Sequence, residues 1–385
     1  MSDAPPVRGE FAAVGRREIT IVRGEGARLW DDRGRSFVDL GISLGVGNLG
    51  HSNPAIVHAI ETQARQLIHV GSACDTPPRH DFVQRLLELL PPSLDRVFLS
   101  NSGAEGMETA LKFARSSTAR PGFVAALRGF HGRTFGALSA TWRRDLREPF
   151  EPLVPGFSHV PYNDAAQLDR AVDQTTAAVI LELVQGEGGV HVIDPEYLHA
   201  ARAICDRSGA LLIFDEIQTG MGRTGRRFAF ERWGILPDIL VLAKSLAGGI
   251  PIGATITTED VERRFRGTHH STFGGNALAC AAGRAALDYL VSERLDERAE
   301  RLGTEAMAQL RRSPSARVRE VRGLGLLIGI ELKERAAPYL QALRERGFLA
   351  IGAGPNVIRL LPPLVISEAD WSAGLSAISE VLANG

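Results

Sequence analysis

Lys244 is the residue whose reactive chemistry stands out first. Only three of the 44 basic side chains are lysines, and Lys244 directly follows the apolar run Ile239–Ala243. An amine can form a Schiff base with a carbonyl compound. Burial or a cationic neighbour lowers the amine's pKa from about 10.4, which makes it a usable base near neutral pH. Lys244 is therefore a candidate nucleophile and a candidate base.

Other reactive side chains also follow short apolar runs. In chain order, these are Ser102 with Gly103 and Ala104 after the run Arg96–Leu99, Phe130 with Arg133 after Gly122–Leu127, Glu187 after Ala177–Leu181, and Asp215 with Gln218 after Ala210–Phe214. Apolar runs without polar alternation are typical of parallel strands that are covered on both faces. Ligands bind beyond the carboxyl ends of such strands. We therefore expect these side chains and Lys244 to meet at one edge of one sheet.

This set of residue types suits pyridoxal phosphate. The turn Ser102–Ala104 opens a helix, whose free N–H groups can hold a phosphate dianion. Phe130 offers a flat face for the pyridine ring. Asp215 can keep the ring nitrogen protonated, which makes the ring a better electron sink. Lys244 would hold the cofactor as a Schiff base and would then move a proton between substrate and cofactor carbons.

Each of these residues also has an ordinary structural explanation. An aspartate at a strand end often caps the following helix, and a lysine there commonly emerges into solvent. Phe130 alone would be a core residue, and Arg133 and Arg359 alone would be surface ion-pair partners. The interpretation as a cofactor site depends on their convergence at one edge of the sheet.

The elements that must position these residues alternate between strands and helices. Residues 19–40 are predicted to form short strands with a turn at Asp32–Gly34, and from Val318 on we expect two strands and two helices. Between them, helices are expected over Pro54–Gln66, Pro78–Leu90, Ala104–Ala114, Pro195–Ser208 and Asn276–Val291. This alternation predicts an α/β fold with a mostly parallel central sheet.

The length of the chain predicts more than one domain. Its 385 residues exceed the size of about 250–300 at which single cores stop growing. We predict a large domain over residues 51–280 and a smaller α+β domain over residues 281–385, which the N-terminal segment 1–50 joins.

Composition excludes several classes of protein. The formal net charge of −1 gives no sign of nucleic-acid or membrane-surface binding, and no apolar stretch is long enough for a membrane span. The segment Met1–Phe11 lacks the layout of a secretory signal, so a cytoplasmic location is expected. The three cysteines are scattered, which predicts neither a disulfide framework nor a metal site.

The motifs around these residues resemble those of class III aminotransferases. The resemblance is strongest in Phe214–Gly225 (FDEIQTGMGRTG) and Pro237–Gly253 (PDILVLAKSLAGGIPIG), where Asp215 stands 29 residues before Lys244. It extends to Gly50-His51, Asn53-Pro54, Ser102–Glu105, Phe130–Thr134, Gln185–Gly189, Ser271–Asn276 and Val321–Gly325. The resemblance implies a pyridoxal-phosphate-dependent enzyme of fold type I that works as a homodimer with shared active sites.

The same resemblance implies roles for the site residues. The cofactor-binding set would be Ser102, Gly103, Ala104, Phe130, Asp215, Gln218, Lys244 and Thr272, the last contributed by the other subunit. Arg133 and Ser271 would contact the substrate, with Arg133 on a carboxylate. Arg359 would hold the α-carboxylate of glutamate, and Glu187 would neutralise Arg359 when an ω-amino substrate is bound. A bidentate arginine and an internal ion pair thus let one pocket accept both substrates.

Within the class, the chain resembles the acetylornithine aminotransferase branch, including members whose substrate is carried by a small acidic protein. The resemblance implies amino transfer between glutamate or 2-oxoglutarate and the terminal carbon of a blocked semialdehyde, in lysine or arginine biosynthesis. An acidic carrier would favour an arginine-rich rim. Two runs could supply it, Arg143-Arg144 with Arg147 or Arg263-Arg264 with Arg266, although both also fit solvated helix faces.

Three positions depart from the family pattern. His270 stands before Ser271-Thr272 where glycine is usual, Leu183 follows Glu182 where proline is usual, and Met107 replaces a smaller or polar residue. They put the substrate in doubt rather than the class of chemistry.

Two alternatives remain to be weighed. Gly45–Gly50 matches the dinucleotide fingerprint, which would indicate a nicotinamide oxidoreductase, but no βαβ context surrounds it and no acidic residue follows at the expected distance. An aminomutase or a decarboxylase can share the fold. Arg133, Glu187 and Arg359 together favour a transaminase with two substrates over both.

Overall fold

The computed structural model describes residues 19–71, 73–312 and 315–384. Within them, the strand order of the central sheet is β4-β12-β11-β10-β7-β5-β6. The bounds, in that order, are Arg96–Ser100, Gly253–Thr257, Ile239–Leu242, Leu211–Asp215, Thr176–Leu181, Gly122–Ala126 and Phe157–Val160. All neighbours are parallel except β12, which is antiparallel to both β11 and β4. The predicted mostly parallel sheet is confirmed.

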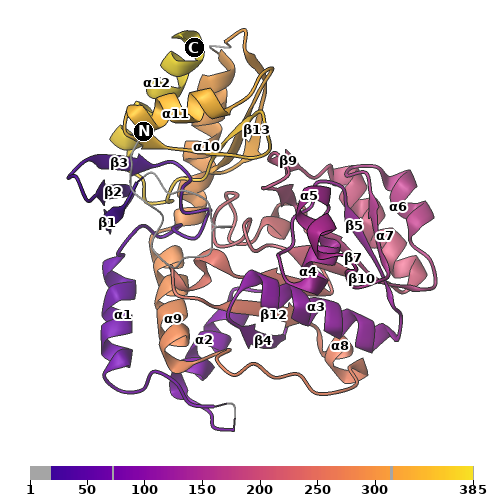
Figure 1. Cartoon of the computed structure of the whole chain (residues 1–385). Coiled ribbons are helices and arrows are strands. Elements are labelled where there is room, and N and C mark those ends of the chain that lie inside the picture. Colours follow the sequence, from indigo (N-terminus) through magenta and orange to yellow (C-terminus); the bar gives the residue numbers. More distant parts are fainter. Residues whose placement is uncertain (1–18, 72, 313–314, 385) are drawn as a thin grey trace.

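Helices cover the sheet, which explains why its strands are continuously apolar. β7, β10 and β11 are buried at every position. α3 (Gly103–Thr118) packs along β11 and β12, and α7 (Pro195–Ser208) packs along β7 and β10 (Figure 1). The remaining helices beside the sheet are α4 (Phe135–Ala140), α5 (Arg144–Arg147), α6 (Ala165–Ala171) and α8 (Glu259–Arg264).

Three further helices pack together on one side of the large sheet. α9 (Ala277–Ser292) packs against α1 (Pro54–Ala64) and α2 (Pro77–Glu88). The contact is close, since a Cβ added at Gly283 of α9 would stand 2.7 Å from the ring of Phe82. α9 therefore packs with the large domain, although residue 280, at which we placed the predicted boundary, lies inside it.

The C-terminal part builds a second sheet and joins the N-terminal strands. Its sheet has the order β13-β14-β17-β16, with bounds Val318–Leu324, Leu327–Leu332, Val357–Leu360 and Ile351–Gly352. α10 (Leu295–Arg312), α11 (Ala337–Glu345) and α12 (Glu368–Asn384) pack around it. β1 (Ile21–Glu25), β2 (Arg28–Asp31) and β3 (Ser36–Asp39) form a third sheet, which β15 (Phe348–Leu349) extends in parallel.

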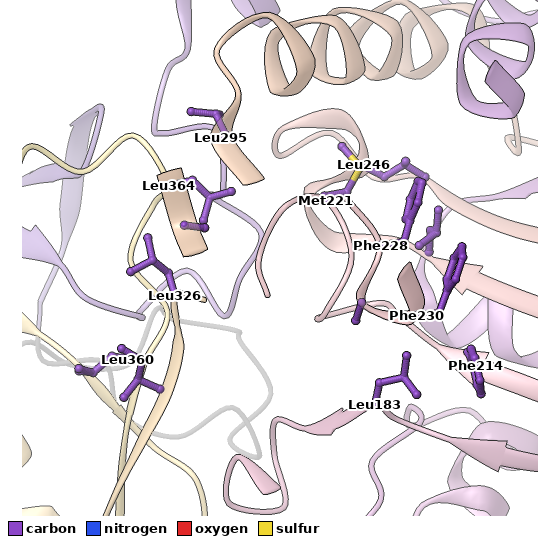
Figure 2. Close-up of a cluster of buried hydrophobic side chains, with 14 of the residues drawn as sticks. Leu183, Phe214, Met221, Phe228, Phe230, Leu246, Leu295, Leu326, Leu360 and Leu364 are labelled. Atoms are coloured by element: carbon purple, nitrogen blue, oxygen red, sulfur yellow. The ribbon is translucent and has the colours of Figure 1, made fainter. Parts of the chain in front are cut away.

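The two parts of the chain share one hydrophobic core. Figure 2 shows Phe214, Phe228 and Leu246 of the large domain in the same cluster as Leu326 and Leu360 of the C-terminal part. The pairing of β3 with β15 supports the prediction that the N-terminal segment joins the small domain, although residues 1–18 lie outside the described chain. The division into domains remains a prediction.

The sequence underestimated the number of strands. The tail from Val318 on contains five strands where we expected two, and the large sheet contains β6 and β12 besides the five expected runs. β15 and β16 are two residues each, and β12 (GATIT) mixes glycine and threonine with apolar residues. Such segments become strands through pairing with their neighbours, because their local pattern is too short or too polar to predict one.

Neither a membrane span nor a metal site is found in the described residues. No helix among them is long and apolar enough to cross a membrane. They also contain no group of histidine, cysteine, aspartate and glutamate side chains that could hold a metal ion.

Candidate active site

Five strands deliver the predicted residues to one edge of the sheet. Because β12 runs antiparallel between β4 and β11, β4 points in the same direction as β11, β10, β7 and β5. Their carboxyl ends therefore lie on the same side, where ligands bind in open parallel sheets. The prediction that these strand ends lie at one edge of the sheet is confirmed.

The strand β11 ends at Leu242, and Ala243 follows it. Lys244 comes next and opens a short 3-10 helix, Lys244–Ala247. Its φ of 42° is left-handed, which is uncommon for a residue other than glycine and marks a backbone held by its surroundings. Burial lowers the pKa of Lys244, while the charges of Glu187 and Asp215 oppose this shift. The side chain is thus closer to its free-amine form than an exposed lysine would be.

Asp215 ends β10 and is held by a histidine that the sequence analysis did not assign. The Oδ2 atom of Asp215 lies 2.7 Å from Nδ1 of His131, and Oδ1 accepts a hydrogen bond of 3.1 Å from the Ile217 N–H. Burial lowers the pKa of His131, but the hydrogen bond and charge of Asp215 outweigh it and the net shift is upward. His131 therefore fixes the orientation of the Asp215 carboxylate. Its position next to Phe130 was the available signal.

Glu182 is a second buried carboxylate that the sequence analysis left without a role. Oε1 accepts a hydrogen bond of 2.9 Å from the Phe130 N–H, and Oε2 accepts one of 3.3 Å from the Gly186 N–H. Burial raises the pKa of Glu182 to about 7, and the charge of His131 opposes that rise. Glu182 ties the loop that carries Phe130 to the loop that carries Glu187. Its place at the end of β7 was the signal.

The turn at the start of α3 fits a phosphate group. The Ser102 hydroxyl accepts a hydrogen bond of 3.2 Å from the Glu105 N–H, and the Ser102 carbonyl accepts one of 3.0 Å from Gly106. The N–H groups of Gly103 and Ala104 donate to no described residue, so they are free for an anion. A Cβ at Gly103 would stand 2.8 Å from Ile217, so the turn lies against the segment that follows Asp215. These residues fit the phosphate and ring of pyridoxal phosphate.

The predicted pair of Arg359 and Glu187 is present. Arg359 lies in β17 and its side chain is 1% exposed, whereas the Glu187 side chain is 33% exposed. Nη1 of Arg359 lies 2.6 Å from Oε1 of Glu187. It also donates to Oε1 of Gln218 at 3.4 Å. A buried guanidinium from the C-terminal part is thus paired at the edge of the large domain's site.

A cavity of about 1040 Å³ opens beside this pair. Phe130 and Glu187 line it from the large domain, and residues 352–357 line it from the C-terminal part. Its lining also includes five arginines, namely Arg128, Arg143, Arg144, Arg319 and Arg322. Of the two predicted arginine runs, therefore, the one with Arg143 and Arg144 lies at a cavity, while Arg263 is not among its lining residues.

Among the described residues, Arg133 and Thr272 do not contact this cluster, whereas Ser271 lies at its margin. Arg133 is exposed and has no hydrogen bond or ion pair with any described residue. Thr272 is also exposed. Ser271 accepts a hydrogen bond of 3.2 Å from the Asn101 side chain, which places it next to the turn at Ser102. Their predicted roles remain predictions.

The glycine-rich segment Gly45–Gly50 does not lie in a dinucleotide-binding unit. The strand before it, β3, pairs antiparallel with β2 and belongs to the small N-terminal sheet. The Asn48 side chain donates a hydrogen bond of 2.9 Å to the Met221 carbonyl and so ties the segment to the large domain. The geometry gives no support to the oxidoreductase alternative.

A lysine after a sheet strand, an aspartate on the neighbouring strand and a helix N-terminus with free N–H groups are the parts of a pyridoxal-phosphate site. The chain belongs to the class III aminotransferase family. The model of this family, described as aminotransferase class-III, matches residues 11–382. It is an aminotransferase, and its cofactor is pyridoxal phosphate. The sequence-based assignments of family, fold, enzyme class and cofactor are confirmed.

Relatives with known names cover nearly the whole chain. An acetylornithine aminotransferase of Methanopyrus kandleri is 48% identical, over 95% of this chain and 95% of the relative. A LysW-aminoadipate semialdehyde transaminase of Deinococcus radiodurans is 47% identical, over 96% of this chain and 87% of the relative. The solved ornithine aminotransferase of Toxoplasma gondii, described with partial occupancy of pyridoxal phosphate, is 36% identical with a TM-score of 0.91, over 95% of this chain and 90% of that one.

Proposed function

We propose that this aminotransferase moves an amino group between glutamate or 2-oxoglutarate and the terminal carbon of a blocked amino-acid semialdehyde, in lysine or arginine biosynthesis. The pair of Arg359 and Glu187, at 2.6 Å, is the observation that carries the proposal. The relatives at 48% and 47% identity, an acetylornithine aminotransferase and a LysW-aminoadipate semialdehyde transaminase, support it, since their names specify substrates of this kind.

The chain's own residues would hold the cofactor and move the proton. The free N–H groups at Gly103 and Ala104 would bind the phosphate, and Phe130 would lie against the ring. When bound, pyridoxal phosphate supplies an electron sink for the bonds of the substrate's reacting carbon. Asp215, oriented by His131, would hold the proton on the ring nitrogen. Lys244 would take the proton from the substrate carbon and return it.

The pair of Arg359 and Glu187 would let one pocket take two kinds of substrate. Glutamate carries a carboxylate next to its reacting carbon, and this carboxylate would displace Glu187 and bind Arg359 in the bidentate manner that a guanidinium favours. An ω-amino substrate has no carboxylate there, so the internal pair would stay closed and leave no uncompensated buried charge. Arg133 would bind the other carboxylate, and Gln218, which contacts Arg359, would lie near the cofactor oxygen.

We further propose that the blocked end of the substrate is carried by a small acidic protein. The cavity beside Glu187 is rimmed by arginines, and Arg144 is its most open one, with an 86% exposed side chain. A positive rim would attract an acidic carrier at the side where its substrate must enter. The Deinococcus relative, named for a LysW-linked substrate, supports this choice.

The test compares two substrates with glutamate as donor. We expect a higher kcat/KM on a carrier-linked ω-semialdehyde than on N-acetylglutamate semialdehyde. Arg144→Glu should lower the carrier-linked value by about three- to tenfold at low salt and leave the acetylated one unchanged. Arg263→Glu is the matched control, because Arg263 is similarly exposed and paired with an aspartate on its own helix, outside the cavity lining. Equal or better turnover of the acetylated compound would remove the carrier from the proposal.

A further inference from the structure

We propose that Arg143 is the second partner of Glu187, and that it receives the Glu187 carboxylate when a substrate carboxylate takes over Arg359. This inference rests on the proposed function, because it concerns the same exchange of substrates. It assigns a specificity-determining role to a residue that does not touch the reacting atoms. Arg143 would set how readily glutamate and 2-oxoglutarate enter, and would leave the ω-amino substrate unaffected.

The backbone that carries Glu187 is held in place, so the carboxylate must leave Arg359 by rotation of its side chain. A Cβ at Gly186 would stand 1.7 Å from Oε1 of Gln218, and one at Gly188 would stand 2.5 Å from the carbonyl oxygen of Arg128. Gly188 is thus packed against backbone that cannot give way, and the Gly186 N–H is held by its hydrogen bond of 3.3 Å to Oε2 of Glu182. The Glu187 side chain itself is one third exposed and lines the cavity. The cavity is therefore the space into which it can turn.

Most cations around that cavity already have partners. Nη1 of Arg128 lies 2.7 Å from Nε2 of His191. Arg319 lies 3.0 Å from Glu331, and Arg144 lies 3.2 Å from Glu148. Arg322 donates to the Gly189 carbonyl, to Glu320 and to Glu331. Arg128 is thus held by an imidazole and Arg322 by three acceptors, while Arg144 is 86% exposed, where an ion pair contributes little.

Arg143 is itself paired with Asp145, but its side chain is less exposed than the other two arginines with one acidic partner, at 52% against 60% for Arg319 and 86% for Arg144. One edge of its guanidinium is left for a second carboxylate. It binds Asp145 through Nε at 3.1 Å and Nη2 at 2.5 Å, and its Nη1 donates to no described residue. The hydrogen bond with Asp145 raises the pKa of Arg143, and the charge of Glu187 adds to that rise against the effect of burial. Arg143 and Glu187 thus line the same cavity and lie within electrostatic range of each other.

The segment that carries Arg143 is fixed to the cofactor side of the site. The Trp142 N–H donates a hydrogen bond of 2.9 Å to the Gly129 carbonyl, and the Thr141 hydroxyl accepts one of 2.9 Å from the His131 N–H. Residues 141–143 therefore keep their position beside the loop Gly129–His131. A displaced Glu187 would find Arg143 in place without a rearrangement of that loop.

The effect should appear in one half-reaction only. With glutamate or 2-oxoglutarate, Glu187 must leave Arg359 and needs a new partner in a partly buried cavity, where an unpaired charge is costly. With an ω-amino substrate, the pair of Arg359 and Glu187 stays closed and Arg143 is not used. A purely structural role for Arg143 would affect both half-reactions alike.

The experiment follows each half-reaction of the holoenzyme by the absorbance of the cofactor, with glutamate in one arm and N-acetylornithine in the other. Arg143→Met should raise the apparent dissociation constant for glutamate by about three- to fivefold and leave that for N-acetylornithine unchanged. Arg143→Lys should restore most of the loss. Arg263→Met is the control, since Arg263 is paired with Asp260 at 2.9 Å and lies outside the cavity lining. In a Glu187→Gln background, Arg143→Met should add nothing.

Three results would overturn the inference. They are an unchanged glutamate constant in Arg143→Met, an equal loss in both arms, and a loss that persists in the Glu187→Gln background. A wild-type enzyme that reacts with N-acetylornithine but shows no reaction with glutamate would overturn the proposed function together with this inference. A wild-type enzyme that reacts with both, combined with an unaffected variant, would overturn this inference alone.

Discussion

The imidazole of His131 lies between two buried carboxylates at the rim of the large sheet. It is hydrogen-bonded to Asp215 at 2.7 Å, and the charge of Glu182 also favours its protonated form. Burial raises the pKa of Glu182 to about 7, so near neutral pH this carboxyl is partly protonated. The protonated form of Glu182 lowers the number of negative charges beside His131. This leaves Asp215 as the carboxylate that His131 orients for the cofactor.

The small number of lysines makes the covalent role of Lys244 directly testable. Treatment of the holoenzyme with borohydride should leave a pyridoxyl group on the peptide that contains Lys244, and Lys244→Ala should abolish this adduct. Lys112→Ala and Lys333→Ala are matched controls, because they remove the other two lysines. Peptide mass spectrometry is the measurement. An adduct that persists on another residue in the wild type would contradict the assignment.

The segment between β10 and the 3-10 helix Ala229–Arg232 joins three parts of the chain through the guanidinium of Arg223. This side chain is fully buried, and burial lowers its pKa to about 9. It donates hydrogen bonds of 2.8 Å to the Leu326 carbonyl, 2.7 Å to the Pro362 carbonyl and 2.5 Å to Oδ1 of Asn48. Pro362 closely follows β17, so the same contact helps to place Arg359 over the sheet. The family motif around Arg223 thus has a structural purpose here.

Arg223→Met should destabilise the fold, because it leaves three buried acceptors without donors. We expect a loss of about 2–4 kcal/mol in the free energy of unfolding, measured by urea denaturation of the apoenzyme. Arg226→Met is the control, since Arg226 is exposed and makes one hydrogen bond, to the Gly225 carbonyl. It should change stability by less than about 0.5 kcal/mol. Equal effects of the two substitutions would show that Arg223 does not join these segments.

Exposed apolar side chains near Thr272 support the prediction, implied by the family resemblance, that the active molecule is a homodimer. Phe273 is 59% exposed and its ring lies against His69 at 5.1 Å between centroids, while the neighbouring Ile68 is 57% exposed. Leu67 is also exposed. An apolar patch of this kind is typical of a surface that another chain covers. Thr272 has no anionic partner in the part of the chain that the structure describes, which agrees with its predicted contact to the phosphate of the other subunit.

Mixed dimers test that contact. Thr272→Ala should weaken cofactor binding about tenfold or more, because a hydrogen bond to a charged group is lost. Lys244→Ala removes the covalent link. When the two variants are mixed and allowed to exchange subunits, one site per mixed dimer would combine Lys244 of one chain with Thr272 of the other. Equilibrium titration should then recover a tight class of cofactor sites. If titration of the mixture shows no tight class of cofactor sites, Thr272 acts in the site of its own chain.

The sequence by itself determined the reactive edge of the sheet. Each predicted run became a strand within one or two residues. Ser102, Glu187 and Lys244 follow the carboxyl ends of strands, and Asp215 is the last residue of one. The physical reason is that parallel strands covered by helices must be continuously apolar, and that their carboxyl ends lie on one side. The pattern of apolar runs therefore indicated where these reactive side chains lie in the fold. The motifs then added the family and the cofactor.

Only the tertiary structure decided which distant residues meet. Strand order and loop packing decide that His131 holds Asp215 and that Glu182 joins two loops. They also decide that Arg143, and not Arg263, lines the cavity beside Glu187. The resemblance predicted that Arg359 and Glu187 act together, but their contact at 2.6 Å is set by how the C-terminal part packs against the large sheet. Local propensity acts over a few residues, whereas these contacts join segments far apart in the chain, so packing alone could decide them.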